Sequence, residues 1–246
     1  MHSTVIVAAN GQRIVGGQET SIGQVPYLVY LRQSGRFICG GSLLTPRSVL
    51  SAAHCVYGAK AKDYTVHAGA SRLEEQASVV RNVHSFHIAP DYRPSNFDMD
   101  VAILRLTTPA SLSPGQVATI APCRTPPSSN AYVRISGWGV TRENNRYPAA
   151  QVRTTNVRVL PHLECQLAYA GQALLSDSML CAAIRGIKDS CSGDSGGPLV
   201  FRGQVCGIVS WGFGCARPAY PGVYTSVASP RVYRFIEQTL RELQIE

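Results

Sequence analysis

Short β-prone runs separated by turn residues constrain the fold of this chain more than any other feature of its sequence. They recur along most of its length, at residues 27–31, 48–52, 64–68, 101–106, 133–136, 152–159, 198–201, 205–210 and 222–227. The 22 glycines and 15 prolines supply many of the turn residues between them. Such spacing is typical of antiparallel barrels or a sandwich, and not of alternating strand–helix–strand units. We therefore expect an all-β protein.

The end of the chain breaks this pattern. Ser229-Pro230 is a typical helix start. The apolar residues that follow it fall at helical spacing, at Val232, Phe235, Ile236, Leu240 and Leu243. We expect an amphipathic helix that docks on the strands and has no binding role. Residues 119–130 are rich in Pro, Ser and Thr, and we expect them to connect two halves of the chain.

The formal charge of +8 favours association with anionic partners in general. The basic residues are scattered, however, and do not alternate with aromatic residues, which favours a solvated basic surface over nucleic-acid binding. No apolar run approaches the ~20 residues of a membrane-spanning helix. We therefore expect neither nucleic acid as a partner nor a membrane span.

Eight cysteines are present, without the C-x2-C spacing of zinc sites. They are Cys39, Cys55, Cys123, Cys165, Cys181, Cys191, Cys206 and Cys215. An even number without metal spacing predicts four disulfides and an oxidising compartment, so we expect a secreted, extracellular protein. Residues 1–13 lack the basic start and long apolar run of a signal peptide. Two alternatives stay open: a leader is missing from this sequence, or export depends on a signal that it does not reveal.

The segment from Gly193 to Pro198 places Ser195 among three glycines, with Asp194 directly before it. Gly, Asp, Ser and Pro are all turn formers, so a surface turn is one interpretation. The other is a nucleophile, because a tight glycine-rich turn can expose the hydroxyl and direct backbone N–H groups at an oxyanion. A serine nucleophile also needs a base, most often histidine, and a group that orients that base.

Among the six histidines, His54 has the most distinctive surroundings, because small residues precede it and Cys55 follows it. Small neighbours allow tight packing, and a disulfide at Cys55 would fix the backbone. Asp100 directly precedes an apolar run and is expected to be the buried, orienting carboxylate, whereas Asp98 is expected to be solvated. The alternatives are a structural histidine and an aspartate that ends a turn before a strand.

Taken together, these motifs resemble the chymotrypsin-like serine proteases, and the trypsin-type branch in particular. The resemblance runs from Ile14 to the C-terminal helix. It rests on Ile14-Val15-Gly16-Gly17, Ser51-Ala52-Ala53-His54-Cys55, Asp100-Val101-Ala102-Ile103-Leu104, Ser136-Gly137-Trp138-Gly139, the segment from Gly193 to Pro198, and Ser210-Trp211-Gly212.

The resemblance implies two antiparallel six-stranded Greek-key barrels with a C-terminal α-helix, and a catalytic cleft between the barrels. Residues 1–13 are then a leader or activation segment and residues 14–246 a peptidase domain. Within that domain, the first barrel is expected at about 14–120, the second at about 121–228 and the helix at about 230–244.

The resemblance also implies a catalytic mechanism, that of a Ser-His-Asp triad. Ser195 attacks the scissile carbonyl, His54 accepts the serine proton and later delivers it to the leaving amine, and Asp100 orients His54. The backbone N–H groups of Gly193 and Ser195 form the oxyanion hole. The expected activity is therefore that of a serine endopeptidase that needs no cofactor.

Substrate specificity follows from the same resemblance. Asp189 is expected at the base of the primary pocket, where its carboxylate demands a cationic partner, and Ser190 beside it can accept a hydrogen bond from Lys. Cleavage after both Arg and Lys is therefore expected. The small and aromatic residues expected around this substrate-binding region are Ser210, Trp211, Gly212 and Gly222. Phe97 is expected to shape the site for the preceding substrate residue, and Phe213 to add an apolar wall further back.

Arg13-Ile14 resembles a zymogen cleavage site. The new Ile14 amine is expected to insert after cleavage and pair with Asp194, which would order the oxyanion hole and the pocket. Arg13 implies an activating protease that is itself trypsin-like, either another protease or this enzyme. The uncut chain is then expected to be nearly inactive.

Three disulfides are implied by the resemblance: Cys39–Cys55, Cys165–Cys181 and Cys191–Cys215. Cys123 and Cys206 are left over, and their pairing is a hypothesis. Ala70 stands where a calcium-binding loop of relatives usually starts with Glu, and Pro221 matches the relatives that do not bind sodium. We therefore expect no metal requirement, so EDTA should leave activity unchanged.

Two other functions remain as alternatives: a catalytically silent relative that works by binding, and a disulfide-rich structural module. The silent relatives usually lack a triad residue, whereas this chain keeps all three, and a structural module does not account for the ordered motifs. The partners expected for the active enzyme are protein or peptide substrates with Arg or Lys at the cleavage site, the activating protease and protein protease inhibitors. A monomer is expected.

Overall fold

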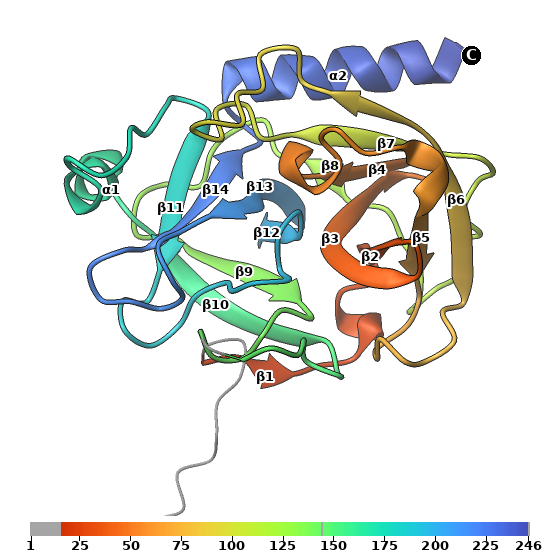
Figure 1. Ribbon diagram of the computed structural model, residues 1–246, viewed down its shortest axis with the longest axis horizontal. Coiled ribbons are helices and arrows are strands. Elements are labelled where there is room, and N and C mark those ends of the chain that lie inside the picture. Colours follow the sequence, from red (N-terminus) through yellow and green to blue (C-terminus); the bar gives the residue numbers. More distant parts are fainter. Residues whose placement is uncertain (1–15, 144, 246) are drawn as a thin grey trace, which may run out of the picture.

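The computed structural model describes residues 16–143 and 145–245, and the statements below concern that part of the chain. Its strands form two closed barrels that lie side by side, with the C-terminal helix across them (Figure 1). The expected all-β fold of two six-stranded antiparallel barrels with a C-terminal helix is confirmed. Arg13 and Ile14 lie outside the described residues.

The first barrel closes in the strand order β2-β3-β4-β7-β6-β5. Its strands are β2 (Leu28–Gln33), β3 (Arg36–Thr45), β4 (Ser48–Ser51), β5 (Tyr64–Ala68), β6 (Val79–Ile88) and β7 (Ala102–Leu106). Side chains alternate between the two faces of each strand, so every second residue points inward. In β5, for example, Tyr64, Val66 and Ala68 are buried, whereas Thr65 and His67 are partly exposed.

The second barrel contains β9 (Tyr132–Gly137), β10 (Arg153–Val159), β11 (Met179–Ala183), β12 (Pro198–Phe201), β13 (Gln204–Trp211) and β14 (Gly222–Ser226). It closes because β9 pairs with both β10 and β12. Val133, Ile135, Val157 and Leu199 are among its buried core residues. These residues form an apolar core that is distinct from the core of the first barrel.

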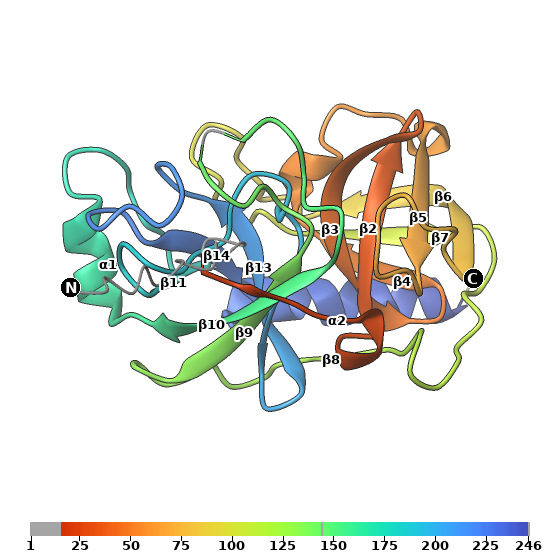
Figure 2. The ribbon, with the colours of Figure 1, turned by 90° about the horizontal axis from the view of Figure 1, so that it is seen from below.

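The N-terminal strand differs from the expected division of the chain. Strand β1 (Gln18–Glu19) lies within the range assigned to the first barrel, but it pairs with β10 of the second. Two residues carry no periodicity from which a pairing partner could be predicted. Figure 2 shows this segment crossing the face of the second barrel before the chain enters β2. Strand β8 (Ala121–Pro122), in the expected connector, pairs in parallel with β13.

Two α-helices complete the described chain: the short α1 (His162–Ala168) and the C-terminal α2 (Pro230–Ile245). Helix α2 begins at Pro230, as its sequence predicts, because proline needs no hydrogen-bond acceptor in the first turn. Val232 and Ile236 are fully buried against the core of the first barrel, although α2 follows the second in sequence. The helix therefore packs the C-terminal end of the chain against the first barrel.

Four disulfides join all eight cysteines: Cys39–Cys55, Cys123–Cys206, Cys165–Cys181 and Cys191–Cys215. These are the pairs expected from the sequence. Cys123–Cys206 ties the connector to β13. Within the described residues, neither helix is both long enough and apolar enough to cross a membrane.

Candidate active site

His54 lies where β4 passes into a short 3₁₀ helix (Ala53–Cys55). The small residues around it let the two barrels approach closely. A Cβ on Gly196 would collide with the Ser51 hydroxyl and the Gly40 carbonyl, and Gly196 has a φ of +77°. The Ser51 Oγ donates to the Gly40 carbonyl at 2.9 Å, and the Gly40 N–H donates to the Ser195 carbonyl at 2.8 Å. These contacts bring the His54 segment of the first barrel against the Ser195 loop of the second.

Asp100 is fully buried and orients His54. One carboxylate oxygen accepts the His54 backbone N–H at 2.9 Å, and the other accepts from the Nδ1 atom of the ring at 2.8 Å. A proton on Nδ1 leaves the lone pair of Nε2 available as a base. Two groups of the second barrel complete the setting: the Ser210 hydroxyl donates to the carboxylate at 2.5 Å, and Thr225 donates to the Asp100 carbonyl at 2.8 Å.

Ser195 lies in the loop between β11 and β12, partly exposed. Gly193 has a φ of +93°, a backbone conformation that favours glycine. Within the described residues, the N–H groups of Gly193 and Ser195 donate to no protein acceptor, so both are available to a ligand. No hydrogen bond joins the Ser195 hydroxyl to His54 among these residues. Such bonds are often long in unliganded enzymes and shorten when substrate binds.

Asp194 is buried beneath this loop. Its carboxylate accepts the backbone N–H groups of Gly139 at 2.8 Å and of Cys191 at 3.0 Å. A Cβ at either Gly137 or Gly139 would collide with the carboxylate and displace it, so glycine at both positions leaves the carboxylate its place. Burial raises the pKa of Asp194 to about 6, because these two hydrogen bonds only partly replace water. The site therefore suits a cationic partner. The partner expected from the sequence, the Ile14 amine, lies outside the described residues.

A cavity of about 250 Å³ opens beside Ser195, and Asp189 lines it. Asp189 is only 1% exposed and accepts the backbone N–H groups of Ser190 at 2.8 Å and Ala216 at 3.0 Å. Burial raises its pKa to about 7. Among the described residues, no cationic side chain forms an ion pair with it. A ligand with a cationic group of matching length would therefore gain a strong partner here.

Glycines line part of this cavity, and their surroundings show why small residues stand there. A Cβ on Gly222 would collide with the Asp189 carboxylate, whereas one on Gly212 would make only ordinary contacts with the protein. Gly212 therefore leaves room for a ligand and is not required by the fold itself. The Tyr224 hydroxyl donates to the Ser190 Oγ at 3.1 Å and so orients it. The Cys191–Cys215 disulfide joins two of the lining segments.

Aromatic side chains continue from the cavity along the surface. Phe97 contacts the His54 ring edge to face, with centroids 5.7 Å apart, and also stacks near Trp211. Tyr169 contacts both Trp211 and Phe213. This arrangement agrees with the positions expected for Phe97 and Phe213. At the rim, Arg217 forms an ion pair with Glu143, which also lines the cavity.

One cluster of potential metal ligands lies at this site. The ligand atoms of Cys39, His54 and Cys55 all lie within 4.8 Å of one another. Cys39 and Cys55 form a disulfide, however, so neither sulfur is a thiolate that could bind a metal. The cluster instead places the disulfide next to the histidine that it braces.

The prediction for Asp98 is wrong. Asp98 is only 8% exposed and forms a network with Ser176, Ser178 and Arg231. Burial opposes ionisation of Asp98, but the hydrogen bonds from the two serines and from Arg231 outweigh it and lower the pKa. These partners are 78 to 133 residues away in sequence, so no local pattern could reveal them.

Several further residues at the site have no signal in the sequence. Thr225 and Tyr224 lie on neighbouring positions of β14 and contact Asp100 and Ser190. Ser210, expected only at the substrate-binding surface, is also the residue that donates to the Asp100 carboxylate. The arrangement as a whole combines an oriented imidazole, an exposed hydroxyl, two free N–H donors and a pocket with an anionic base. Such a set can support acyl transfer through a serine nucleophile.

The comparisons with known proteins agree with this geometry. The sequence matches the family model Trypsin over residues 14–236. Seminase of Drosophila melanogaster is 40% identical over 225 residues, which cover 91% of this chain and 81% of seminase. Trypsin beta of Drosophila erecta is 38% identical over 89% of this chain and 86% of its own length. The solved structure of neuropsin, a serine protease expressed in the limbic system of mouse brain, is 33% identical with a TM-score of 0.83, covering 91% of this chain and 98% of neuropsin.

Proposed function

This chain belongs to the trypsin family of serine proteases and is a serine endopeptidase, and we propose that it cleaves peptide bonds after Arg and Lys. The buried Asp189 carboxylate at the base of the cavity carries this proposal. An isolated carboxylate is costly away from water, and a substrate guanidinium or ammonium group would remove that cost. The planar guanidinium of Arg can form two parallel hydrogen bonds with the carboxylate, and the Ser190 hydroxyl can accept one from Lys.

In the proposed mechanism, Ser195 is the nucleophile and His54 the base. The Ser195 Oγ bonds to the scissile carbonyl carbon while its proton passes to the His54 Nε2. The protonated imidazole then donates this proton to the leaving amine, and the C–N bond breaks to give an acyl-enzyme. Water attacks the acyl-enzyme by the same route, which releases the acid and restores the serine.

Asp100 and the two free N–H groups support this chemistry in different ways. The Asp100 carboxylate keeps the proton on Nδ1 and stabilises the imidazolium that forms. The N–H groups of Gly193 and Ser195 are proposed to bind the oxyanion of the tetrahedral intermediate. Removing a single donor of this kind typically costs about 3–4 kcal/mol of transition-state stabilisation.

We further propose that the enzyme is secreted as a zymogen and is activated by cleavage at Arg13-Ile14. The buried Asp194 supports this step, because its carboxylate has two backbone donors but no cationic partner among the described residues. The new Ile14 amine would supply that charge. A chain with Arg13→Gln is expected to remain nearly inactive when treated with a trypsin-like protease. Full activity of an intact Arg13→Gln chain would overturn the activation proposal.

The specificity is tested with fluorogenic peptides on the chain cut at Arg13-Ile14. Peptides ending in Arg or Lys are expected to be cleaved, and those ending in Phe or Leu are not. Asp189→Ser is the matched variant, and its kcat/KM for Arg peptides should fall by two to three orders of magnitude, the equivalent of about 3–4 kcal/mol. Efficient cleavage after Phe by the unchanged enzyme would refute the role of Asp189.

A fluorophosphonate probe tests the nucleophile separately. We expect Ser195 to be labelled only after cleavage at Arg13, and Ser195→Ala to abolish labelling. A protein that binds without catalysis would stay unlabelled in both forms, which would contradict the proposed mechanism.

A further inference from the structure

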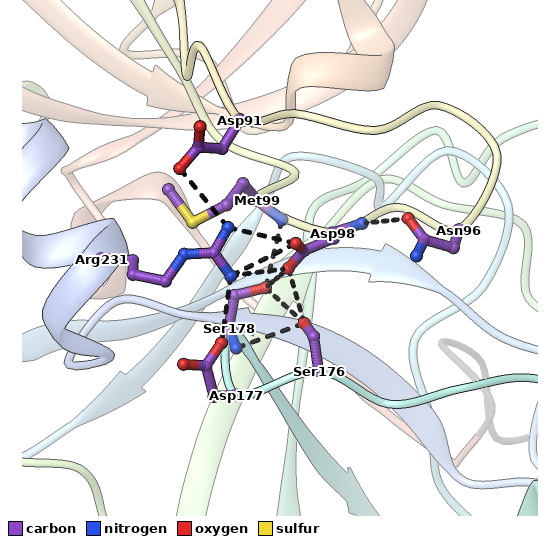
Figure 3. A network of polar contacts seen from close by, with 8 residues as sticks. All are labelled: Asp91, Asn96, Asp98, Met99, Ser176, Asp177, Ser178 and Arg231. Carbon is purple, nitrogen blue, oxygen red and sulfur yellow. Dashed lines mark hydrogen bonds and ion pairs between the residues drawn. The ribbon is translucent and has the colours of Figure 1, made fainter.

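Asp98 connects three parts of the molecule that are distant in sequence (Figure 3). Its carboxylate accepts the hydroxyls of Ser176 at 2.7 Å and Ser178 at 2.8 Å, both from the segment that precedes β11. Arg231, in the first turn of α2, donates to the carboxylate at 3.2 Å. Asp98 thus joins the segment before β7 to the second barrel and to the C-terminal helix.

The backbone on both sides of Asp98 is strained. Phe97 has a φ of +59° and Met99 a φ of +56°, a region that residues with a side chain rarely adopt. The surrounding structure must offset the strain of each such residue. The same network provides the support, because the Met99 N–H donates to the Ser178 Oγ at 3.1 Å.

The residues held in this way are those that touch His54. Phe97 lies against one side of the imidazole, and Asp100 accepts its Nδ1 proton. Within the described residues, Asp98 contacts neither His54 nor the cavity beside Ser195. It can act on the site through Phe97, directly before it, and through Asp100, two residues after it.

We propose that Asp98 is a positioning residue, which fixes the 97–100 segment through Ser178 and Arg231 so that Phe97 and Asp100 set the orientation of the His54 ring. The proposal rests on the proposed function of His54 as the base. It extends that function by assigning a role in catalysis to a carboxylate that touches no reacting atom.

The network offers its own matched controls. Arg231 also forms ion pairs with Asp177 at 3.1 Å and with Asp91 at 3.5 Å, both through mostly exposed carboxylates. Asp177→Asn and Asp91→Asn therefore each remove one ion pair of the same guanidinium without removing a contact to Phe97, Met99 or Asp100. A general loss of surface charge around Arg231 would affect these variants as much as Asp98→Asn.

The test compares Asp98→Asn and Ser178→Ala with the two controls in the chain cut at Arg13-Ile14. We expect kcat/KM on an Arg peptide to fall about tenfold or more in both test variants, because small displacements of catalytic groups are costly. Ser178→Ala removes the Met99 acceptor without altering a charge, so it carries the test if Asp98→Asn does not fold. The controls should stay close to the unchanged enzyme.

Three further readouts separate positioning from a general loss of structure. The loss should depend on whether the substrate has Gly or Leu before the Arg, because Phe97 moves. The acidic limb of the pH–rate profile should shift, because the setting of His54 changes. The downfield proton resonance of His54 Nδ1 should also shift or broaden. Equal behaviour of the test and control variants in all three would overturn the proposal.

The magnetic resonance readout also keeps the two proposals apart. If the unchanged enzyme does not cleave Arg or Lys peptides, the proposed specificity fails. The His54 Nδ1 resonance still tests the positioning role in that case, because it reports the hydrogen bond to Asp100 and needs no substrate.

Discussion

Asp189 and Asp194 are buried carboxyl groups that affect stability in the opposite direction from most acidic residues. Burial raises the pKa of Asp189 to about 7 and that of Asp194 to about 6, against 3.8 for an ordinary aspartate. Between pH 3.8 and these raised pKa values, the folded chain therefore binds more protons than the unfolded chain. As the pH rises through this window, both groups lower the free energy of unfolding.

The raised pKa of Asp189 predicts that binding of a small cation is linked to proton release. Benzamidine, an aromatic amidinium, should favour the ionised carboxylate, so its affinity should rise as the pH increases from about 5 to about 7. Calorimetry in two buffers of different ionisation enthalpy should detect the released proton at pH 6. Asp189→Asn should bind weakly and release none. An affinity independent of pH would contradict the prediction.

His67 makes the opposite contribution. Its ring stacks on Tyr30, and burial, followed by the charge of Arg32, lowers its pKa from 6.5 to about 4. The unfolded chain therefore binds more protons in this window, so stability is lost as the pH falls from 6.5 towards 4.

We expect His67→Gln to lose less stability over this pH window than the unchanged protein does. Urea unfolding at pH 4.5 and pH 7 measures the difference. His84→Gln, at an exposed position of β6, is the control and should follow the unchanged protein. Identical pH slopes for His67→Gln and the unchanged protein would refute the assignment.

At the scale of single residues, the sequence predicts those whose role depends on their own chemistry and on their near neighbours in the chain. His54, Asp189 and Ser195 stand in distinctive local motifs, and the structure brings them to one region. Asp98 and Arg231 could not be predicted, because their pairing depends on how α2 returns to the first barrel. The burial of a charged residue is decided by such distant packing and not by the residues beside it in sequence.

At the scale of secondary-structure elements, α2 is the clearest test of packing. Ile236 is fully buried against the first barrel, whereas Gln238 is exposed on the same helix. We expect Ile236→Ala to lower the free energy of unfolding by about 2–5 kcal/mol, because the cavity it leaves can only partly collapse. Gln238→Ala should change it by less than about 0.5 kcal/mol. Denaturant unfolding curves measure both, and equal values would contradict the described packing.

The strands show which patterns sequence reasoning can detect. Runs that contain several β-branched residues, such as 205–210, correspond closely to the observed β13. Strand β3 was not among the predicted runs, because it carries Cys39, Gly40 and Gly41 in its middle. Strand β6 was not among them either, because polar residues occupy many of its partly exposed positions. In β3, Gly40 allows close approach of Gly197 from the second barrel, and the pattern of β3 alone does not record this contact.

At the scale of the whole molecule, the Cys123–Cys206 disulfide joins the connector between the barrels to the second barrel. It spans 83 residues of sequence, so the loop that it closes in the unfolded chain is long. We expect Cys123→Ala combined with Cys206→Ala to cost about 2–5 kcal/mol of stability. The activity on Arg peptides should be retained at low temperature, because neither cysteine lines the cavity beside Ser195. Thermal unfolding and kcat/KM of the double variant test both statements, and an unchanged Tm would refute the first.

The hydrogen bonds that Asp100 accepts from both barrels have a consequence for how the chain could be divided into two fragments. Asp100 precedes β7 of the first barrel, but Ser210 and Thr225, which donate to it, belong to the second. Under the proposed mechanism, hydrolysis therefore requires that each barrel is folded and that the two barrels are docked. A chain divided in its connector would yield two fragments that are silent alone, and their recovered activity would report how often they meet.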